Sequence, residues 1–373
     1  MDVAPPPRRV LFVFAFLLVG GEETEACLLA KYLDPARYAI EVVECVGKPN
    51  APTQTYRKLE ALGVPVDRTP RDLPFEDAVR YLADKVGGYD VIIACQAVPH
   101  IVPALERATR RPPLIEHGGT VGEVSVTPKH STTRFVGVCA AIRDAAAALL
   151  PGRPQHALEI PSMVDLAAFD PAHRSAVRAE WAVSDGAPVF GWVGRLDRRK
   201  RAGDFVRAAA LVHAEHPEAR FLVIGGPSGF DPAYADEVRA LADELALNRV
   251  LTFLGDRSDV PRLLSGLDAL VLTAQGEGMP HVIAEAGAAG LPVVATREDG
   301  SAEQITDGVS GLFVPHESPA AVAAALKRLI AEPALGHRLG GNLRRKVERE
   351  YSVTAILPRW EALLAEVIME SNR

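Results

Sequence analysis

The sequence predicts an α/β protein built from two doubly wound domains, each with a parallel β-sheet covered by helices on both faces. Short, continuous apolar runs alternate with amphipathic helical patterns from one end of the chain to the other. Such runs are typical of strands that are buried on both faces of a sheet. The 373 residues exceed one ordinary domain and suit two.

The predicted strands fall into two series. The first series comprises the runs Val10–Phe14, Ala39–Glu44, Asp90–Cys95, Pro113–His117 and Phe135–Val138. The second comprises Val189–Val193, Phe221–Ile224, Leu251–Leu254, Ala269–Thr273 and Pro292–Ala295. A polar helical stretch near residues 165–187 separates them. We therefore predict a first domain over residues 1–168 and a second over 169–353. A helix over about residues 354–373 has no strand after it and could pack back on the first domain.

Composition argues against several classes of protein. The formal net charge of −7 is unlike that of a dedicated nucleic-acid binder. No run reaches the ~18 apolar residues of a membrane span, so we expect no transmembrane segment, while peripheral membrane contact stays open. The four cysteines are scattered and form no C-x-x-C pair, which favours a reduced, cytoplasmic setting. The apolar start resembles a signal peptide, but the acidic GGEETEACLLAKYL that follows favours a strand, a glycine loop and a helix.

The segment over residues 276–296, GEGMPHVIAEAGAAGLPVVAT, is the most specific in the chain. Glu277 lies between Gly276 and Gly278 after a buried strand, and Pro280 fits the first turn of a helix. The amides at the start of that helix would attract a diphosphate. Glu285 would reach neutral hydroxyls such as those of a ribose. The alternative is a plain strand–helix crossover with two solvated glutamates.

A second loop, GWVGRLDRRKRAGDF over residues 191–205, places Arg195 and Lys200 after another buried strand. Two cations at the end of a strand suit a leaving diphosphate, whose charge grows as the bond to the transferred group breaks. The alternative is a solvated basic turn, which the flanking arginines also fit.

These two segments together resemble the retaining enzymes of glycosyltransferase family 4, which have the GT-B fold. The resemblance rests on GRLDRRK and on the E-x7-E spacing from Glu277 to Glu285. In the first half, Gly20–Glu23 resembles the family's G-G-x-E loop, and Ile115–Gly118 resembles the strand that ends in a histidine. FLVIGG, VLTFLG and GVSGLFVP in the second half also match the family's order.

The resemblance implies two Rossmann-like domains that face each other across a cleft, with acceptor binding in the first and nucleotide-sugar binding in the second. It also implies a role for each motif residue. Arg195 and Lys200 would bind the donor diphosphate, Glu285 would hold the ribose hydroxyls, and Glu277 would contact the transferred sugar.

Further donor contacts are implied for backbone groups and for one histidine. The amides of Gly278, Met279 and His281, next to Pro280, would lie near the sugar and phosphate. Gly20 and Gly21 would let the backbone approach the phosphates closely, and His117 would lie by the sugar. We expect the chemistry itself to depend on Glu277, His117, Arg195 and Lys200.

The chain also departs from the family pattern. Arg201 stands where a glycine usually follows the lysine, and PSMVD over residues 161–165 replaces P-N-G-V-D. Near Gly300 and Ser301, EDGSAE replaces a glycine pair before a glutamate. None of these changes removes the two cations or the two glutamates.

The implied reaction moves a hexose-type sugar from a UDP- or GDP-type donor to a hydroxyl acceptor with retained anomeric configuration. The acceptor could be a glycan, a lipid-linked molecule or a small molecule. The chain has no D-x-D motif, so we expect no metal and no cofactor beyond the nucleotide-sugar co-substrate. The alternatives are a nucleotide-sugar epimerase or phosphorylase on the same fold, and a non-catalytic protein that closes two lobes on a ligand.

Overall fold

The computed structural model describes residues 5–48, 53–125 and 129–371, and it divides into two compact units. The first unit comprises residues 1–163 and 353–373, and the second comprises residues 164–352. The sequence placed this boundary after residue 168. In the structure the chain joins the second unit earlier, because the Val164 amide donates a hydrogen bond of 2.8 Å to the carbonyl of Tyr351.

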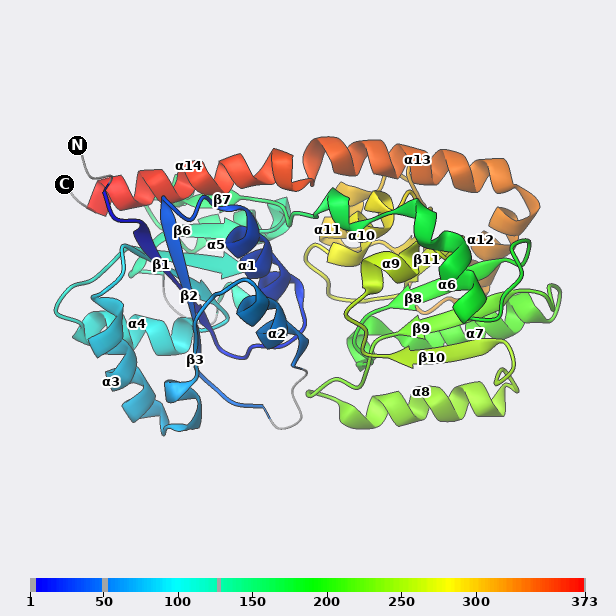
Figure 1. The fold of residues 1–373 in the computed structure, drawn as a ribbon, viewed down its shortest axis with the longest axis horizontal. Coiled ribbons are helices and arrows are strands. Elements are labelled where there is room, and N and C mark those ends of the chain that lie inside the picture. Colours follow the sequence, from blue (N-terminus) through cyan, green and yellow to red (C-terminus); the bar gives the residue numbers. More distant parts are fainter. Residues whose placement is uncertain (1–4, 49–52, 126–128, 372–373) are drawn as a thin grey trace. The chain divides into compact units, whose positions relative to one another are not determined.

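The first unit contains a seven-stranded sheet of order β3-β2-β1-β4-β5-β6-β7, in which every pairing is parallel. Figure 1 shows this sheet with helices on both faces. The strands are β1 Arg8–Phe14, β2 Tyr38–Glu44, β3 Val66–Asp67, β4 Val91–Cys95, β5 Leu114–Gly118, β6 Thr132–Gly137 and β7 Ala157–Glu159. The α-helices are α1 Gly21–Tyr32, α2 Gln54–Ala61, α3 Phe75–Val86, α4 Val98–Arg107, α5 Ala140–Ala148 and α14 Val353–Ser371.

The second unit contains a six-stranded parallel sheet of order β10-β9-β8-β11-β12-β13. Its strands are β8 Val189–Val193, β9 Arg220–Ile224, β10 Leu251–Gly255, β11 Ala269–Leu272, β12 Val293–Thr296 and β13 Leu312–Val314. Its α-helices are α6 Arg174–Glu180, α7 Ala202–His213, α8 Pro232–Glu244, α9 Val260–Leu264, α10 His281–Ala288, α11 Asp299–Gln304, α12 Pro319–Ala331 and α13 Pro333–Glu350.

The predicted fold class is confirmed, and all ten predicted strands are present with small shifts at their ends. The continuous apolar runs have the expected cause, which β1 illustrates. Leu11 and Val13 belong to a core cluster that includes residues of α3 and α4. Val10 and Phe12 belong to the cluster on the opposite face, with residues of α1 and α14. Since both faces are covered, successive residues of the strand are all apolar.

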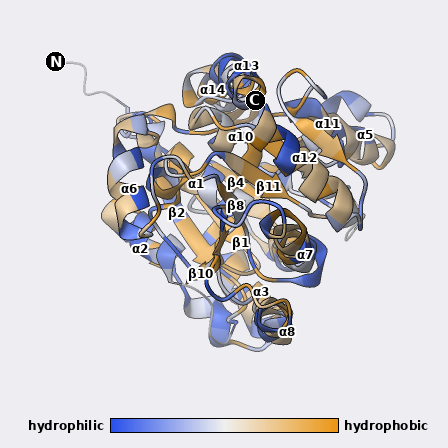
Figure 2. Ribbon diagram, turned by 90° about the vertical axis from the view of Figure 1, so that its right-hand side faces the viewer, coloured by the Kyte–Doolittle hydropathy of each residue, from blue (hydrophilic) through white to orange (hydrophobic). Residues whose placement is uncertain are grey.

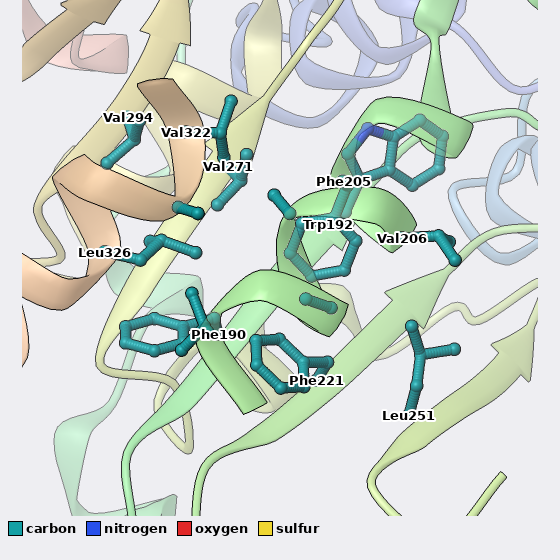
Figure 3. Close-up of a cluster of buried hydrophobic side chains, with 14 of the residues drawn as sticks. Phe190, Trp192, Phe205, Val206, Phe221, Leu251, Val271, Val294, Val322 and Leu326 are labelled. Carbon is teal, nitrogen blue, oxygen red and sulfur yellow. The ribbon is translucent and has the colours of Figure 1, made fainter. Parts of the chain in front are cut away.

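The core of the second unit is aromatic near its centre. Phe190 and Trp192 on β8 lie among Phe205 of α7 and Phe221 of β9, as Figure 3 shows. In Figure 2, which is coloured by hydropathy, the strands are mostly hydrophobic, whereas the helices carry both hydrophobic and hydrophilic residues. All four cysteines are buried. Among the described residues, no helix is long and apolar enough to cross a membrane.

Candidate functional site

The predicted donor loops follow the two central strands of the second sheet. β8 and β11 are paired, with Leu270 opposite Gly191. The chain continues from β8 to β9 on one side and from β11 to β12 on the other. In open parallel sheets, ligands bind beyond the carboxyl ends of the strands where the order reverses in this way. The loop with Arg195 and Lys200 and the loop with Glu277 both lie at this point.

The structure brings Lys200 and Glu277 into direct contact. Lys200 Nζ lies 2.7 Å from Glu277 Oε2, and the two side chains are 17% and 11% exposed. Arg195 is 28% exposed, and its Nε lies 3.8 Å from Asp197 Oδ2. A cation and a carboxylate from segments 77 residues apart therefore form one partly buried pair.

Two residues that the sequence did not single out hold the Lys200 loop in place. Asp197 caps the short 3₁₀ turn Arg198–Lys200, and its Oδ1 accepts a hydrogen bond from the Lys200 amide at 3.2 Å. Thr273, at the end of β11, directs its hydroxyl to the carbonyls of Lys200 and Arg201 at 3.2 and 2.9 Å. Asp197 had a signal in the sequence, since Asp is a preferred cap and lies just before the cations.

The replacement of glycine by Arg201 has a visible conformational cost. Arg201 has φ 53° and ψ 42°, the left-handed region that favours glycine. Its side chain forms two ion pairs, Nε to Asp204 Oδ2 at 2.8 Å and an NH group to Glu317 Oε1 at 3.0 Å. These contacts offset part of the strain that a glycine would avoid.

The glycine loop around Glu277 is organised by Glu298. Glu298 Oε2 accepts hydrogen bonds from the amides of Gly276 and Glu277 at 2.8 and 3.2 Å. Glu298 also caps α11 in a reciprocal arrangement with Ser301. Gly300 packs so closely on this loop that a Cβ there would lie 1.9 Å from the Gly278 carbonyl oxygen. The glutamate that departs from the family pattern thus has a structural role.

The helix after this loop, α10, begins at His281, and Pro280 is its N-cap residue rather than its first residue. The predicted position of Pro280 was therefore wrong by one, because its ψ of 114° is extended rather than helical. In the part of the chain that the structure describes, the amides of Gly278 and Met279 donate no hydrogen bond to the protein. Glu285 lies in the second turn of α10 and is half-buried. The donor contacts assigned to these residues and to His281 stay predictions.

The first unit holds the other predicted residues. Gly20 caps α1, which begins at Gly21, and a Cβ on Gly20 would lie 2.6 Å from Glu23 Oε2. His117 is buried near the end of β5, with Nδ1 3.5 Å from Glu22 Oε1 and its ring 5.6 Å from that of Trp360. Its Nε2 is buried and has no hydrogen-bond partner among the described residues. The roles of Gly20, Gly21 and His117 toward a donor stay predictions.

Three carboxyl groups act on His117, and two of them, Glu22 and Glu25, are buried. Burial favours its neutral form, but the hydrogen bond and charge of Glu22 outweigh burial, and the pKa of His117 is raised. Burial raises the pKa of Glu25 to about 7, although the charge of His117 acts in the opposite direction. Burial, with the charge of Glu22, also raises the pKa of Glu123. This region therefore favours a protonated imidazole.

Glu22, Cys95 and His117 are close enough to be considered as metal ligands. One ligand atom from each lies within 4.8 Å of the others, and all three residues are buried. Burial raises the pKa of the Cys95 thiol, and the carboxylates around it act in the same direction. Since the thiolate is the form that binds metals, these surroundings oppose ligation, and we assign no metal here.

Solved structures share the fold of this chain. HepE from Anabaena, in complex with UDP-glucose, has a TM-score of 0.85 at 21% identity over 96% of this chain and 99% of its own. Sucrose-phosphate synthase from Thermosynechococcus elongatus has a TM-score of 0.77 at 20% identity over 97% of this chain and 100% of its own. With its two parallel-sheet units, this chain is a GT-B protein.

Sequence comparison then relates the second unit to a protein family. Residues 173–346 match the family model described as glycosyl transferases group 1. A D-inositol 3-phosphate glycosyltransferase of Actinosynnema mirum is 33% identical over 205 residues, which cover 53% of this chain and 49% of the relative. One of Mycobacterium sp. (strain KMS) is 38% identical over 153 residues, which cover 40% and 34%. The second unit of the chain thus matches the group 1 glycosyl transferases, and the resemblance to glycosyltransferase family 4 is confirmed. The matches span about half the length of these curated relatives or less.

Proposed function

We propose that this protein is a glycosyltransferase that moves a sugar from a UDP- or GDP-type donor to a hydroxyl acceptor, with retention and without a metal. The observation that carries the proposal is the 2.7 Å pair between Lys200 and Glu277. It joins the two family motifs at the strand ends where ligands bind. Two solvated loops would not require a partly buried cation and carboxylate to meet.

The comparisons support the donor class. HepE, which shares the fold, was solved with UDP-glucose, and the curated relatives are named D-inositol 3-phosphate glycosyltransferases. Because the similarity to those relatives covers about half of each chain, we extend only the class of reaction to this protein. The nucleotide and the acceptor are left to experiment.

The residues suggest how the donor is handled. A diphosphate would compete with Glu277 for Lys200, so donor binding would release the Glu277 carboxylate to accept a sugar hydroxyl. Arg195 adds a second cation, and the amides of Gly278 and Met279 add dipoles at the start of α10. These groups would stabilise charge as it grows on the leaving diphosphate. In this proposal the acceptor proton passes to a phosphate oxygen.

The test replaces Arg195 or Glu285 by alanine and measures donor turnover and nucleotide binding. Loss of a charged hydrogen-bonding partner costs about 2–5 kcal/mol, so we expect kcat/KM to fall by at least about 30-fold. Arg199→Ala is the matched control, because Arg199 lies in the same loop with an exposed side chain and should keep near-normal turnover. Near-normal transfer by both Arg195→Ala and Glu285→Ala would contradict the proposal.

Further assays separate the alternatives. Product formation that needs no acceptor would indicate an epimerase, and product formation that needs phosphate would indicate a phosphorylase. Absence of nucleotide binding in calorimetry would favour a sugar-binding protein. Full transfer in the presence of EDTA is expected, and loss of transfer that Mg²⁺ or Mn²⁺ restores would contradict metal independence.

A further inference from the structure

The first unit contains a basic pocket that the proposed donor site does not use. The pocket has a volume of about 430 Å³ and is lined by Lys48, Thr53, Tyr56, Arg57, Glu60, Arg68 and Arg71. It lies beside the loops that follow β2 and β3, which pair in parallel with Val43 opposite Asp67. It is therefore near the sheet edge where doubly wound domains bind ligands.

Charge is concentrated in this basic pocket. Four of the lining residues are cations and one, Glu60, is an anion, in a chain whose formal net charge is −7. Arg71 forms ion pairs with Glu44 and Asp72, whereas Arg57 forms no ion pair with another described residue. The Arg68 guanidinium lies 3.8 Å from the centre of the Tyr56 ring, which orients it without neutralising it. The pocket thus keeps a positive potential.

A buried carboxylate, that of Glu44, contacts two of the residues that line the pocket. Glu44 is 1% exposed, and its Oε2 accepts a hydrogen bond of 2.5 Å from the Tyr56 hydroxyl. The same oxygen lies 3.6 Å from an NH group of Arg71. Its other oxygen accepts from the Leu17 amide at 3.1 Å, in the loop that leads to Gly20. Arg71 Nε is buried and lies 3.5 Å from Asp72 Oδ1, so the exposed Arg57 and Arg68 are the guanidinium groups left for a ligand.

We propose that this basic pocket binds a phosphate group carried by the acceptor. Several guanidinium groups suit a phosphate better than a single carboxylate, because each offers a planar fork to its oxygens. The volume is within the range of small-molecule sites and leaves room for a polyol or sugar beside the phosphate. The acceptor class is then a phosphorylated polyhydroxy compound, whose free hydroxyl receives the transferred sugar. The role of the phosphate compound as an acceptor rests on the proposed function, whereas the binding of a phosphate in the pocket does not depend on it.

The experiment titrates glucose 6-phosphate, with glucose as the uncharged reference, into the full-length protein by calorimetry. The pocket variant is Arg57→Gln/Arg68→Gln, which removes two charges that form no ion pair with any residue that the structure describes. Arg107→Gln is the control, because Arg107 is a partly exposed arginine of the same unit that pairs with Glu76 outside the pocket. We expect binding of glucose 6-phosphate but not glucose, at least tenfold weaker binding in the pocket variant, and unchanged binding in Arg107→Gln.

Two arms complete the test. Vesicles of phosphatidylcholine with phosphatidic acid distinguish a lipid headgroup from a soluble phosphate, and pocket-dependent binding of either supports the inference. Equal affinity of wild type and pocket variant, or no phosphate binding in either arm, would overturn it. UDP and GDP binding, measured in the same variants, should stay within twofold of wild type. If the wild-type protein binds no nucleotide, the proposed function is wrong but this inference stands. If the wild-type protein shows no pocket-dependent phosphate binding, this inference is wrong but the proposed function stands.

Discussion

Replacement of Gly300 by alanine tests whether the Gly278–Met279 backbone takes part in donor use. A Cβ on Gly300 would lie 1.9 Å from the Gly278 carbonyl oxygen and 2.6 Å from Met279 Cα, whereas ordinary contact begins at 3.4 Å. The loop and α11 must therefore separate by about 1.5 Å, the difference between 3.4 and 1.9 Å. Gly300 has no positive φ, so the effect is steric rather than a matter of backbone strain.

Displacement of this size should affect catalysis more than folding. A misplacement of about 1 Å can reduce a rate by about 10²-fold, which corresponds to about 2.7 kcal/mol. Overpacking ordinarily costs about 1–3 kcal/mol of stability. We therefore expect Gly300→Ala to lose about 10²-fold in kcat/KM for the donor while it stays folded at the assay temperature. Steady-state nucleotide release and thermal unfolding measure the two effects.

Two glycines of the same unit provide controls. A Cβ on Gly186 would have no atom within 4 Å among the described residues, so Gly186→Ala should change neither quantity. Gly266 precedes β11, at the end of the strand away from the Glu277 loop. A Cβ on Gly266 would lie 2.5 Å from the Trp181 ring, so Gly266→Ala should lower the stability without changing kcat/KM. If Gly300→Ala keeps a kcat/KM within twofold of that of Gly186→Ala, the position of the Gly278–Met279 backbone does not matter for donor use and the reasoning is refuted.

Three further predictions concern stability. Arg178 is completely buried and donates hydrogen bonds to the carbonyls of Gly266 and Ser184 at 3.0 and 2.7 Å. Arg178→Met should therefore lower the free energy of unfolding by about 3–5 kcal/mol. A decrease below about 1 kcal/mol in urea denaturation would contradict this prediction. Burial raises the pKa of Glu25 from 4.5 to about 7, so the stability linked to this group is present below pH 4.5 and is lost as the pH rises through about 7, by at most about 3 kcal/mol. Glu25→Gln should therefore gain on wild type between pH 5 and pH 8, and a constant difference would argue against the raised pKa. Arg201→Ala should be less stable than Arg201→Gly by about 1 kcal/mol, because both lose the ion pairs while glycine alone relieves the positive φ; equal melting temperatures would count against strain.

Much of the fold could be predicted from the sequence because its signal is local. A strand covered on both faces must be apolar at successive positions, and ten segments met that condition. Strands β3, β7 and β13 are not among these ten, because they have only two or three residues and lie at the ends of the two sheets. Edge strands this short bury too little to leave a pattern.

The site was predicted only in part, for a related reason. Glycines and charges that directly follow buried strands identified Arg195, Lys200 and Glu277. Thr273 and Glu298 were not identified, because their function consists of hydrogen bonds to loops 72 and 22 residues away along the chain. Such partners become neighbours only through the order of the strands, which the sequence does not state.

The basic pocket of the first unit shows the same limit. Its cations are spread from Lys48 to Arg71 without a recognisable spacing. Only the parallel pairing of β2 with β3 and the buried carboxylate of Glu44 gather them into one pocket. A charge cluster of this kind has no linear motif.

The position of α14 has a consequence for the order in which the protein is completed during synthesis. Trp360 and its neighbours on α14 belong to the same core cluster as Phe12 of β1 and Leu29 of α1. The ribosome makes all of residues 164–352 before it makes this helix. The unit that is translated first is therefore completed last, and until then one apolar face of its sheet lacks the part of its cover that α14 supplies. Nascent chains that stop short of residue 353 should consequently be targets for chaperones and proteases.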